Sequence, residues 1–288
     1  MVASDASALS LYQQLWQPLA DALLRRGPNA SALRRHAWNF YGARAAAKAD
    51  KVAAAKFGFV SDDEWTMRHA LTSALDRRDD WVGVLGSARR LSEGVVVTGH
   101  WPRSPFIALG THWGAGMPTL AHLCVEGLKP RFVYRQEPTS VWPNAAAKSA
   151  HRLHLQAIDR FGGSIRVGGA YTQIMSSLAA GATPVILMDA PAEGRPTLEG
   201  RGHRLRLQVR SGLLEMLCRE QIRYAFYRCG FDPASGKRHL DIGPEQNPQT
   251  PQAIADQAAL HLEQALMTDS AQWRLWMVAR GLLAVSSV

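Results

Sequence analysis

The stretch "GTHWGAGMPTL", residues 110–120, places a histidine and a tryptophan among three glycines, directly after the apolar run 105–109. Histidine has the side chain that titrates closest to neutral pH, so it can accept and return a proton under physiological conditions. Glycine permits positive φ angles and lets another backbone or a ligand approach closely. This pattern predicts a catalytic turn in which His112 is the base.

The elements that would carry this turn alternate along the middle of the chain. Short runs rich in β-branched or aromatic residues are followed by stretches of helical periodicity, which is typical of an α/β fold with a parallel sheet. We therefore predict a mixed, largely parallel central sheet flanked by helices. The predicted strands lie in 94–101, 105–113, 131–136, 164–169, 183–191 and 222–229, and the predicted helices in 117–128, 144–161, 171–181 and 211–219.

Helices are also predicted towards both ends of the chain. Residues 9–26 carry apolar side chains on one helical face, which fits either a helix packed on the core or one lying on a membrane surface. We expect one domain over 1–288, in which a helical N-terminal region, 1–80, packs on the α/β core. Further helices are predicted at 30–56, 62–80 (after a capping box at 61–64), 251–267 and 270–283, and 193–209 is predicted to be a loop entering a strand.

Composition narrows the class of function. The formal net charge is +9 and the isoelectric point is near 9.9, which fits an acidic partner: nucleic acid, anionic lipid headgroups, the phosphates of CoA or an acidic carrier protein. The charge fits equally well the general use of arginine in a proteome rich in alanine and arginine. The arginines are scattered through every segment rather than gathered with aromatic residues, so we do not expect a nucleic-acid partner. The three cysteines form no CxxC pair, and the histidines lack further ligands at metal spacing, so no metal site is expected.

The chain also lacks the sequence signals of membrane insertion. No apolar stretch approaches the ~20 residues that a membrane span requires. The first residues do not show the order of a signal peptide. We therefore expect a cytoplasmic protein, with peripheral contact to the inner face of the cytoplasmic membrane as a further option.

The order of elements resembles a known superfamily. An apolar strand ends in the His-Trp-Gly turn, and after it come "FVYRQ", "RFGGSI", "YTQIMSSLAAGATPVILMD" and a Trp-containing C-terminal segment. Over residues 90–283 this order resembles the lysophospholipid-acyltransferase-like superfamily, in the branch of the lipid A late acyltransferases and phosphatidylinositol mannoside acyltransferases. The resemblance implies acyl transfer from a thioester of acyl carrier protein or CoA to a hydroxyl or amine of a lipid or small-molecule acceptor. No bound cofactor is implied beyond that acyl donor.

In that superfamily a histidine followed by an acid, HX4D/E, performs the chemistry, and the histidine corresponds to His112. The base takes the proton of the attacking hydroxyl, and the acid fixes its tautomer. In this chain the acid position holds Met117, which carries no charge. Another acid serves, or His112 works unaided, or the site is not catalytic. As replacement acids the resemblance indicates Asp189 first, at the end of "VILMD", and Glu193 second.

Three further residues are assigned to substrate binding. Arg135 corresponds to an arginine that the superfamily places beside the active cleft, where a guanidinium can bind phosphate through two hydrogen bonds. Trp113 and Gly114 follow His112 in the turn and are predicted to shape the space for the thioester carbonyl. The second hypothesis is a degenerate acyltransferase-like protein that binds lipid or carrier protein without chemistry.

Overall fold

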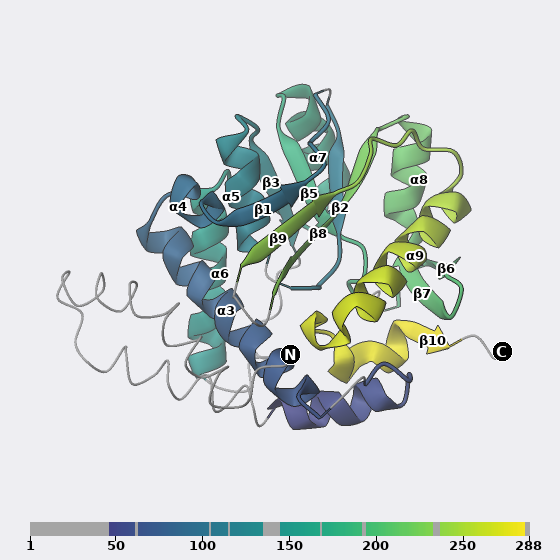
Figure 1. The fold of residues 1–288 in the computed structure, drawn as a ribbon. Helices are drawn as coiled ribbons and strands as arrows, with labels where there is room; N and C mark the ends of the chain where they lie inside the picture. Colours follow the sequence, from purple (N-terminus) through teal and green to yellow (C-terminus); the bar gives the residue numbers. More distant parts are fainter. Residues whose placement is uncertain are drawn as a thin grey trace.

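The computed structural model describes residues 46–60, 63–103, 105–114, 116–134, 145–167, 169–191, 194–232 and 237–285. Within these residues, a seven-stranded sheet has the strand order β1-β9-β8-β2-β5-β3-β4, and a three-stranded sheet has the order β10-β7-β6 (Figure 1). The strands are β1 (Val95–Thr98), β2 (Ile107–Gly110), β3 (Pro130–Tyr134), β4 (Ser164–Arg166), β5 (Thr183–Leu187), β6 (Thr197–Arg201), β7 (Leu205–Arg210), β8 (Tyr224–Phe231), β9 (Arg238–Ile242) and β10 (Leu283–Val285).

The large sheet is mixed and mostly parallel, which confirms the predicted fold class. β8, β2, β5, β3 and β4 pair in parallel. At one edge β9 runs antiparallel to β8, and β1 runs parallel to β9. The parallel strands therefore direct their carboxyl ends to the same edge of the sheet, where α/β proteins place their ligand sites.

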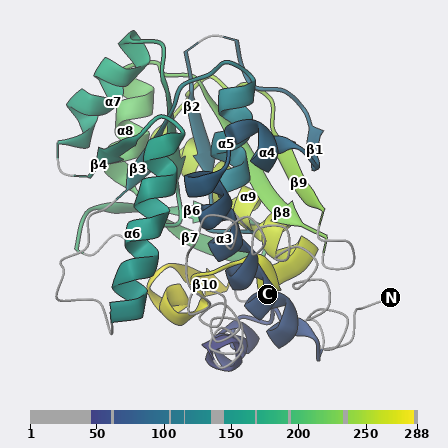
Figure 2. The same ribbon diagram turned by 90° about the vertical axis from the view of Figure 1, so that its left-hand side faces the viewer.

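Helices cover both faces of the large sheet. The described helices are α3 (Trp65–Leu85), α4 (Ala88–Ser92), α5 (Met117–Val125), α6 (Ala145–Arg160), α7 (Ala170–Ala179), α8 (Ser211–Arg219) and α9 (Pro251–Asp269), and residues 46–55 are also helical. In Figure 2, α3, α4, α5 and α6 lie in front of the sheet. Successive side chains of a strand point to opposite faces of the sheet, so apolar strands offer a surface for helices on each face.

β2 shows how this alternation divides the core. Ile107 and Leu109 belong to a hydrophobic cluster that contains Ile254 and Leu262 of α9 and side chains of α7 and α8. Ala108, between them, belongs to a second cluster with side chains of α3, α4, α5 and α6. A strand that is buried on both faces in this way is fixed in position, and so is the turn that follows it.

The C-terminal segment differs from its prediction. Residues 270–283 do not form an amphipathic helix: they form two short 3-10 helices, Ser270–Gln272 and Trp276–Gly281, followed by β10. Trp273, between them, has φ −81° and ψ 132°, an extended conformation. It forms an antiparallel bridge with Trp113. A continuous helix here is wrong because this bridge requires extended backbone.

Two other boundaries were also wrong. The segment 193–209 was predicted as a loop entering a strand: β7 is such a strand, but the part predicted as loop also contains β6, which pairs with β7. Gly200 lies where a Cβ atom would come within 2.0 Å of the Ala255 carbonyl oxygen of α9. The glycine therefore marks a close approach of α9 rather than a loop. α3 begins at Trp65 with Glu64 as N-cap and no capping side chain, instead of at 62 after a capping box. The predicted helix at 9–26 lies outside the described residues.

Candidate active site

His112 and Asp189 meet because of the register between two neighbouring strands. Gly110 at the end of β2 is the parallel partner of Leu187 at the end of β5. Two residues beyond each partner stand His112 and Asp189, so the strand pairing carries both side chains to the same point above the sheet edge. Nδ1 of His112 lies 2.8 Å from Oδ1 of Asp189. The predicted replacement acid is therefore within hydrogen-bond distance of the ring.

Asp189 is fully buried and surrounded by N–H donors. The backbone N–H of His112 lies 3.0 Å from Oδ1 and 2.9 Å from Oδ2, and the indole N–H of Trp273 donates to Oδ2 at 2.7 Å. Burial raises the pKa of the Asp189 carboxyl, but the charge of His112 and the hydrogen bonds from His112 and Trp273 outweigh it and lower the pKa below its ordinary value. The carboxylate is therefore an ionised acceptor at neutral pH.

The His112 ring is oriented by this carboxylate. An ionised carboxylate can only accept, so Nδ1 of His112 carries the proton and Nε2 of the neutral ring has the free lone pair. This tautomer is inferred from the hydrogen-bond network. In the described part of the chain, Nε2 has no hydrogen-bond partner, and the side chain is 24% exposed. A buried acid bonded to Nδ1 of a partly exposed ring is the arrangement of a general base.

Gly114 holds the turn in place through its backbone. Its φ is +70°, and a Cβ atom there would lie 2.0 Å from the carbonyl oxygen of Cys229. Its N–H donates to the Gln272 carbonyl at 2.8 Å. A glycine is required by both the angle and the approach. These contacts are with the chain itself, and a role in substrate binding stays a prediction.

Trp113 is also anchored within the protein. Its indole N–H donates to the Asp269 carbonyl at 2.9 Å. The ring lies against Gly230, where a Cβ atom would come within 2.3 Å of it. The side chain is only partly buried. Its described contacts shape the turn beside His112, and contact with a substrate stays a prediction for this residue too.

Met117, which stands where the resemblance leads one to expect an acid, is a core residue. It begins α5 and is 1% exposed. It packs in the hydrophobic cluster that includes Ala108 and Tyr227. The acid at the ring is thus supplied by the neighbouring strand, while the motif position serves the packing of α5. Arg135 and Glu193, the two other predicted site residues, lie outside the described residues.

The other histidines noted in the sequence have structural partners or are exposed. Nδ1 of His122 lies 3.0 Å from Nε1 of Trp101, which donates to it, and burial lowers the pKa of His122. His154 bonds to Asp80 at 2.8 Å, which ties α6 to α3. His100 is exposed in a segment without regular structure. Among the described residues no group of three or more His, Cys, Asp or Glu side chains could hold a metal ion.

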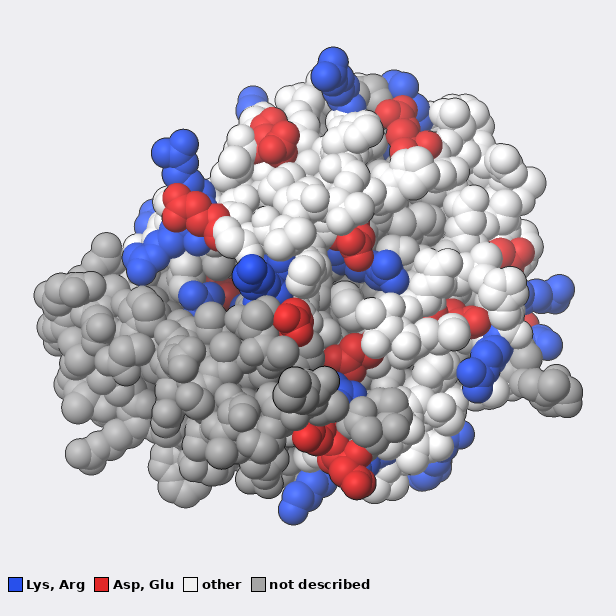
Figure 3. Space-filling view, in the orientation of Figure 1, with Lys and Arg blue, Asp and Glu red and all other residues white. Residues whose placement is uncertain are grey.

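Surface charge and hydropathy add two observations. In the view of Figure 3, Lys and Arg side chains are scattered and several lie next to Asp or Glu, rather than forming one basic face. In the segments that the structure describes, no helix is both long enough and apolar enough to cross a bilayer.

The residue that the sequence analysis missed is Trp273. Its indole reaches Asp189 from the C-terminal segment, where a helix was expected. A buried tryptophan needs a partner for its N–H, and the Trp-rich sequence of 270–283 was a signal of burial. The sequence of 270–283 did not indicate that the acceptor of this N–H would be Asp189.

No protein-family model matches this chain, and no curated protein sequence is similar to it. Among solved structures, the chain is similar to the 1-acyl-sn-glycerophosphate (LPA) acyltransferase PlsC from Thermotoga maritima, with a TM-score of 0.41 and 12% sequence identity. The match covers 92% of this chain and 97% of that chain. At this level of similarity, function has to be inferred from the site itself.

Proposed function

We propose that this protein is an acyltransferase that uses His112 as its general base. It moves an acyl group from a thioester of acyl carrier protein or CoA to a hydroxyl or amine of a lipid or small-molecule acceptor. The observation that carries the proposal is the hydrogen bond of 2.8 Å between His112 Nδ1 and the fully buried Asp189, on a ring that is 24% exposed. Such a pair removes a proton from a weak nucleophile at neutral pH.

The chemistry requires one base and no bound cofactor. Nε2 of His112 takes the proton of the acceptor hydroxyl as its oxygen attacks the thioester carbonyl carbon. The C–O bond forms, the tetrahedral intermediate collapses, and the C–S bond breaks. The imidazolium then returns its proton to the departing thiolate, so the products are an ester and a free thiol. Asp189 keeps its charge throughout and stabilises the imidazolium.

The test is product formation by the purified protein. Mixed acyl-CoA and acyl carrier protein thioesters are incubated with extracted bacterial lipids, and mass spectrometry follows new acylated lipid together with free thiol. We expect acyl transfer with the wild type and a loss of roughly 10²- to 10⁴-fold in turnover with His112→Ala. The matched control is His203→Ala, because His203 is an exposed histidine in the turn between β6 and β7.

Three outcomes would overturn the proposal. Free thiol and free fatty acid without an acylated acceptor would mean that the base activates water, and the protein would be a thioesterase. No turnover by the wild type, combined with binding of acyl thioester or lipid, would favour the non-catalytic protein that Met117 suggests. Full activity of a folded His112→Ala variant would exclude His112 as the base.

A further inference from the structure

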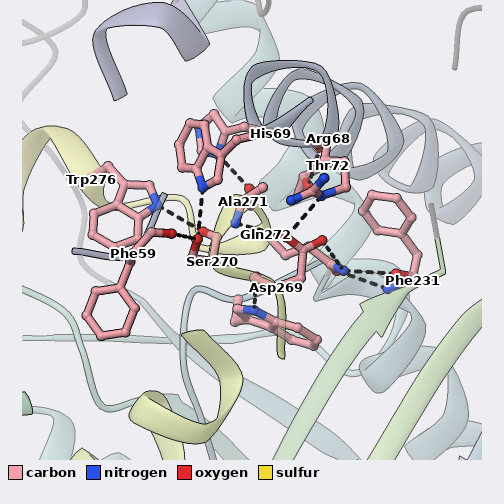
Figure 4. Close-up of polar contacts among 12 residues, drawn as sticks. Phe59, Arg68, His69, Thr72, Phe231, Asp269, Ser270, Ala271, Gln272 and Trp276 are labelled. Carbon is pink, nitrogen blue, oxygen red and sulfur yellow. Dashed lines mark hydrogen bonds and ion pairs between the residues drawn. The ribbon is translucent and has the colours of Figure 1, made fainter. Parts of the chain in front are cut away.

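The C-terminal segment 269–274 connects α3 to the candidate active site. Figure 4 shows polar contacts of its first four residues, Asp269 to Gln272. On one side it bonds to three side chains of the first turns of α3: Trp65 Nε1 to Ser270 Oγ at 2.8 Å, Arg68 Nε to Asp269 Oδ1 at 3.2 Å, and His69 Nδ1 to the Ala271 carbonyl at 2.7 Å. On the other side it bonds to the turn after β2. The segment is thus held from two directions.

The bonds to the turn fix the backbone around His112. The N–H of Arg274 donates to the His112 carbonyl at 3.0 Å, and the N–H of Gly114 donates to the Gln272 carbonyl at 2.8 Å. The Gln272 side chain also accepts from the N–H of Phe231 at 3.0 Å and donates to its carbonyl at 2.9 Å (Figure 4). The residue between these anchors, Trp273, has little freedom to move.

The Trp273 indole is fully buried, and its N–H points at a single carboxylate oxygen. It lies 2.7 Å from Oδ2 of Asp189, while Oδ1 of the same carboxylate faces Nδ1 of His112. An indole N–H is only a donor. It therefore donates to one oxygen a bond that favours the ionised carboxylate, and together with the backbone N–H of His112 it restricts rotation of the group. The other oxygen faces the ring and also lies 3.0 Å from that backbone N–H.

We propose that Trp273 is a positioning residue of the candidate active site. Its indole N–H holds the Asp189 carboxylate in place and ionised, so that the carboxylate orients the His112 ring. The effect on turnover rests on the proposed acyltransferase function, whereas the hydrogen-bonded chain from Trp273 to His112 does not. If Trp273 served only to fill the core, its role would not depend on the indole N–H.

The same aromatic cluster provides a matched control. Trp276 is also almost fully buried, and its ring packs edge-on against that of Trp273 with centroids 4.7 Å apart. Its indole N–H donates to the backbone carbonyl of Ser270 at 3.0 Å and not to the site. Replacing either tryptophan by phenylalanine removes one indole and one hydrogen bond from the same cluster. Only Trp273→Phe removes a bond to Asp189.

The first experiment needs no activity. Indole N–H signals are recorded by NMR on protein labelled with ¹⁵N-tryptophan and assigned with Trp273→Phe and Trp276→Phe. We expect Asp189→Asn to shift the Trp273 indole signal strongly and to leave that of Trp276 near its place. The downfield signal of the His112 Nδ1 proton should weaken or move in Trp273→Phe and persist in Trp276→Phe. An indole signal of Trp273 that does not respond to Asp189→Asn overturns the proposal.

The second experiment measures the rate. We expect Trp273→Phe to lower kcat by roughly 10- to 100-fold with KM little changed, by analogy with the loss of a hydrogen-bond partner behind a metal ligand. Trp276→Phe should keep the wild-type kcat. Equal losses in the two variants would make Trp273 a core residue only. If the wild type transfers no acyl group, the NMR result alone decides the positioning role and the proposed function fails separately. If Trp273→Phe does not fold, the indole signals are assigned through backbone connectivities and Asp189→Asn decides.

Discussion

Asp189 reaches the His112 ring from the neighbouring parallel strand, with Oδ1 at 2.8 Å from Nδ1. The pair is therefore assembled by sheet register rather than by spacing along one turn of chain. The position that would hold the acid in a local motif is filled by Met117, which is buried. Both facts can be tested by substitution.

Asp189→Asn should lower turnover by roughly 10²- to 10⁴-fold with the fold retained. The asparagine amide group donates where the carboxylate accepts, so the ring turns to the wrong tautomer and the imidazolium loses its counter-charge. Steady-state rates in the thioester assay measure the effect, and circular dichroism checks the fold. Wild-type turnover in this variant would show that Asp189 is not the partner acid.

Met117→Glu should not increase turnover and should destabilise the protein. Met117 is 1% exposed among apolar side chains, so a carboxylate there is buried without a partner. Such burial costs several kcal/mol unless the group is protonated. Urea unfolding measures the loss, and Met117→Leu is the control, with an expected cost below about 1.5 kcal/mol. Activity gained by Met117→Glu would instead mean that the native site lacks an effective acid.

Gly114→Ala should destabilise the turn that carries His112. The residue has φ +70°, and the added Cβ atom would lie 2.0 Å from the Cys229 carbonyl oxygen. We expect a loss of about 2 kcal/mol or more in the free energy of unfolding, because the turn has to shift. Gly212→Ala in α8 is the matched control: a Cβ atom meets nothing within 4 Å there, and the change should be neutral or stabilising. Equal stability of the two variants would contradict the backbone placement.

The buried ion pair between Asp79 and Arg238 should be costly to break. Nη2 of Arg238 lies 2.8 Å from Oδ2 of Asp79, and the two side chains are 9% and 1% exposed. Arg238→Met leaves the buried Asp79 with Arg78, whose Nη1 lies 2.8 Å from Oδ1, so the loss in the free energy of unfolding should be about 3 kcal/mol, the low end of the range for a broken buried pair. The control is Glu199→Gln at the exposed pair with Arg206, which should cost less than about 1 kcal/mol.

A double variant sharpens this prediction. Asp79→Leu with Arg238→Met removes both charges, and it should be more stable than the sum of the two single losses implies. Denaturation curves of the four proteins give the coupling free energy. Strict additivity of the two losses would show that the pair contributes no interaction between α3 and β9.

Stability should fall in mild acid because of His261. Burial lowers the pKa of His261 to about 4, while its ring bonds to the Tyr227 carbonyl at 3.0 Å. The unfolded chain takes up the proton from about pH 6.5 downwards, whereas the folded protein does so only near pH 4. The free energy of unfolding therefore declines as the pH drops through this window, by up to about 3 kcal/mol.

The measurement is the difference between wild type and His261→Gln across pH 4 to 7. Glutamine keeps a donor for the Tyr227 carbonyl but does not titrate, so the variant should lose less stability than the wild type between pH 6.5 and 4. Parallel curves for the two proteins would refute this assignment. Other buried groups affect both curves equally and cancel in the difference.

The sequence predicted the parallel core well because its signals are local. Apolar runs that form β2, β5 and β8 and the helices between them are each legible within ten to fifteen residues. Strand order and register are long-range, and it was the resemblance that indicated Asp189, while the rule that parallel strands end at one edge supported its placement near His112. The pair of His112 and Asp189 could therefore be predicted from the sequence, whereas its contact with Trp273 could not.

The errors concern segments whose conformation depends on distant partners. Residues 270–283 have helical periodicity, but the bridge between Trp273 and Trp113 holds them extended. β9, with the sequence "RHLDI", carries three ionisable residues and was not predicted at all. It forms because Arg238 finds Asp79 of α3 and because β1 and β8 pair on both sides. Tertiary contacts outweigh local propensity in both places.

The hold of segment 269–274 on the turn has a consequence for synthesis of the protein. The chain leaves the ribosome from its N-terminus, so β2 and β5 can pair long before Trp273 emerges. Until then, Asp189 lacks its indole partner and the carbonyl of His112 lacks the N–H of Arg274. The nascent chain thus passes through a stage in which His112 and Asp189 are present but lack the hydrogen bonds from Trp273 and Arg274. The order of translation delays a competent site until the scaffold around it is finished.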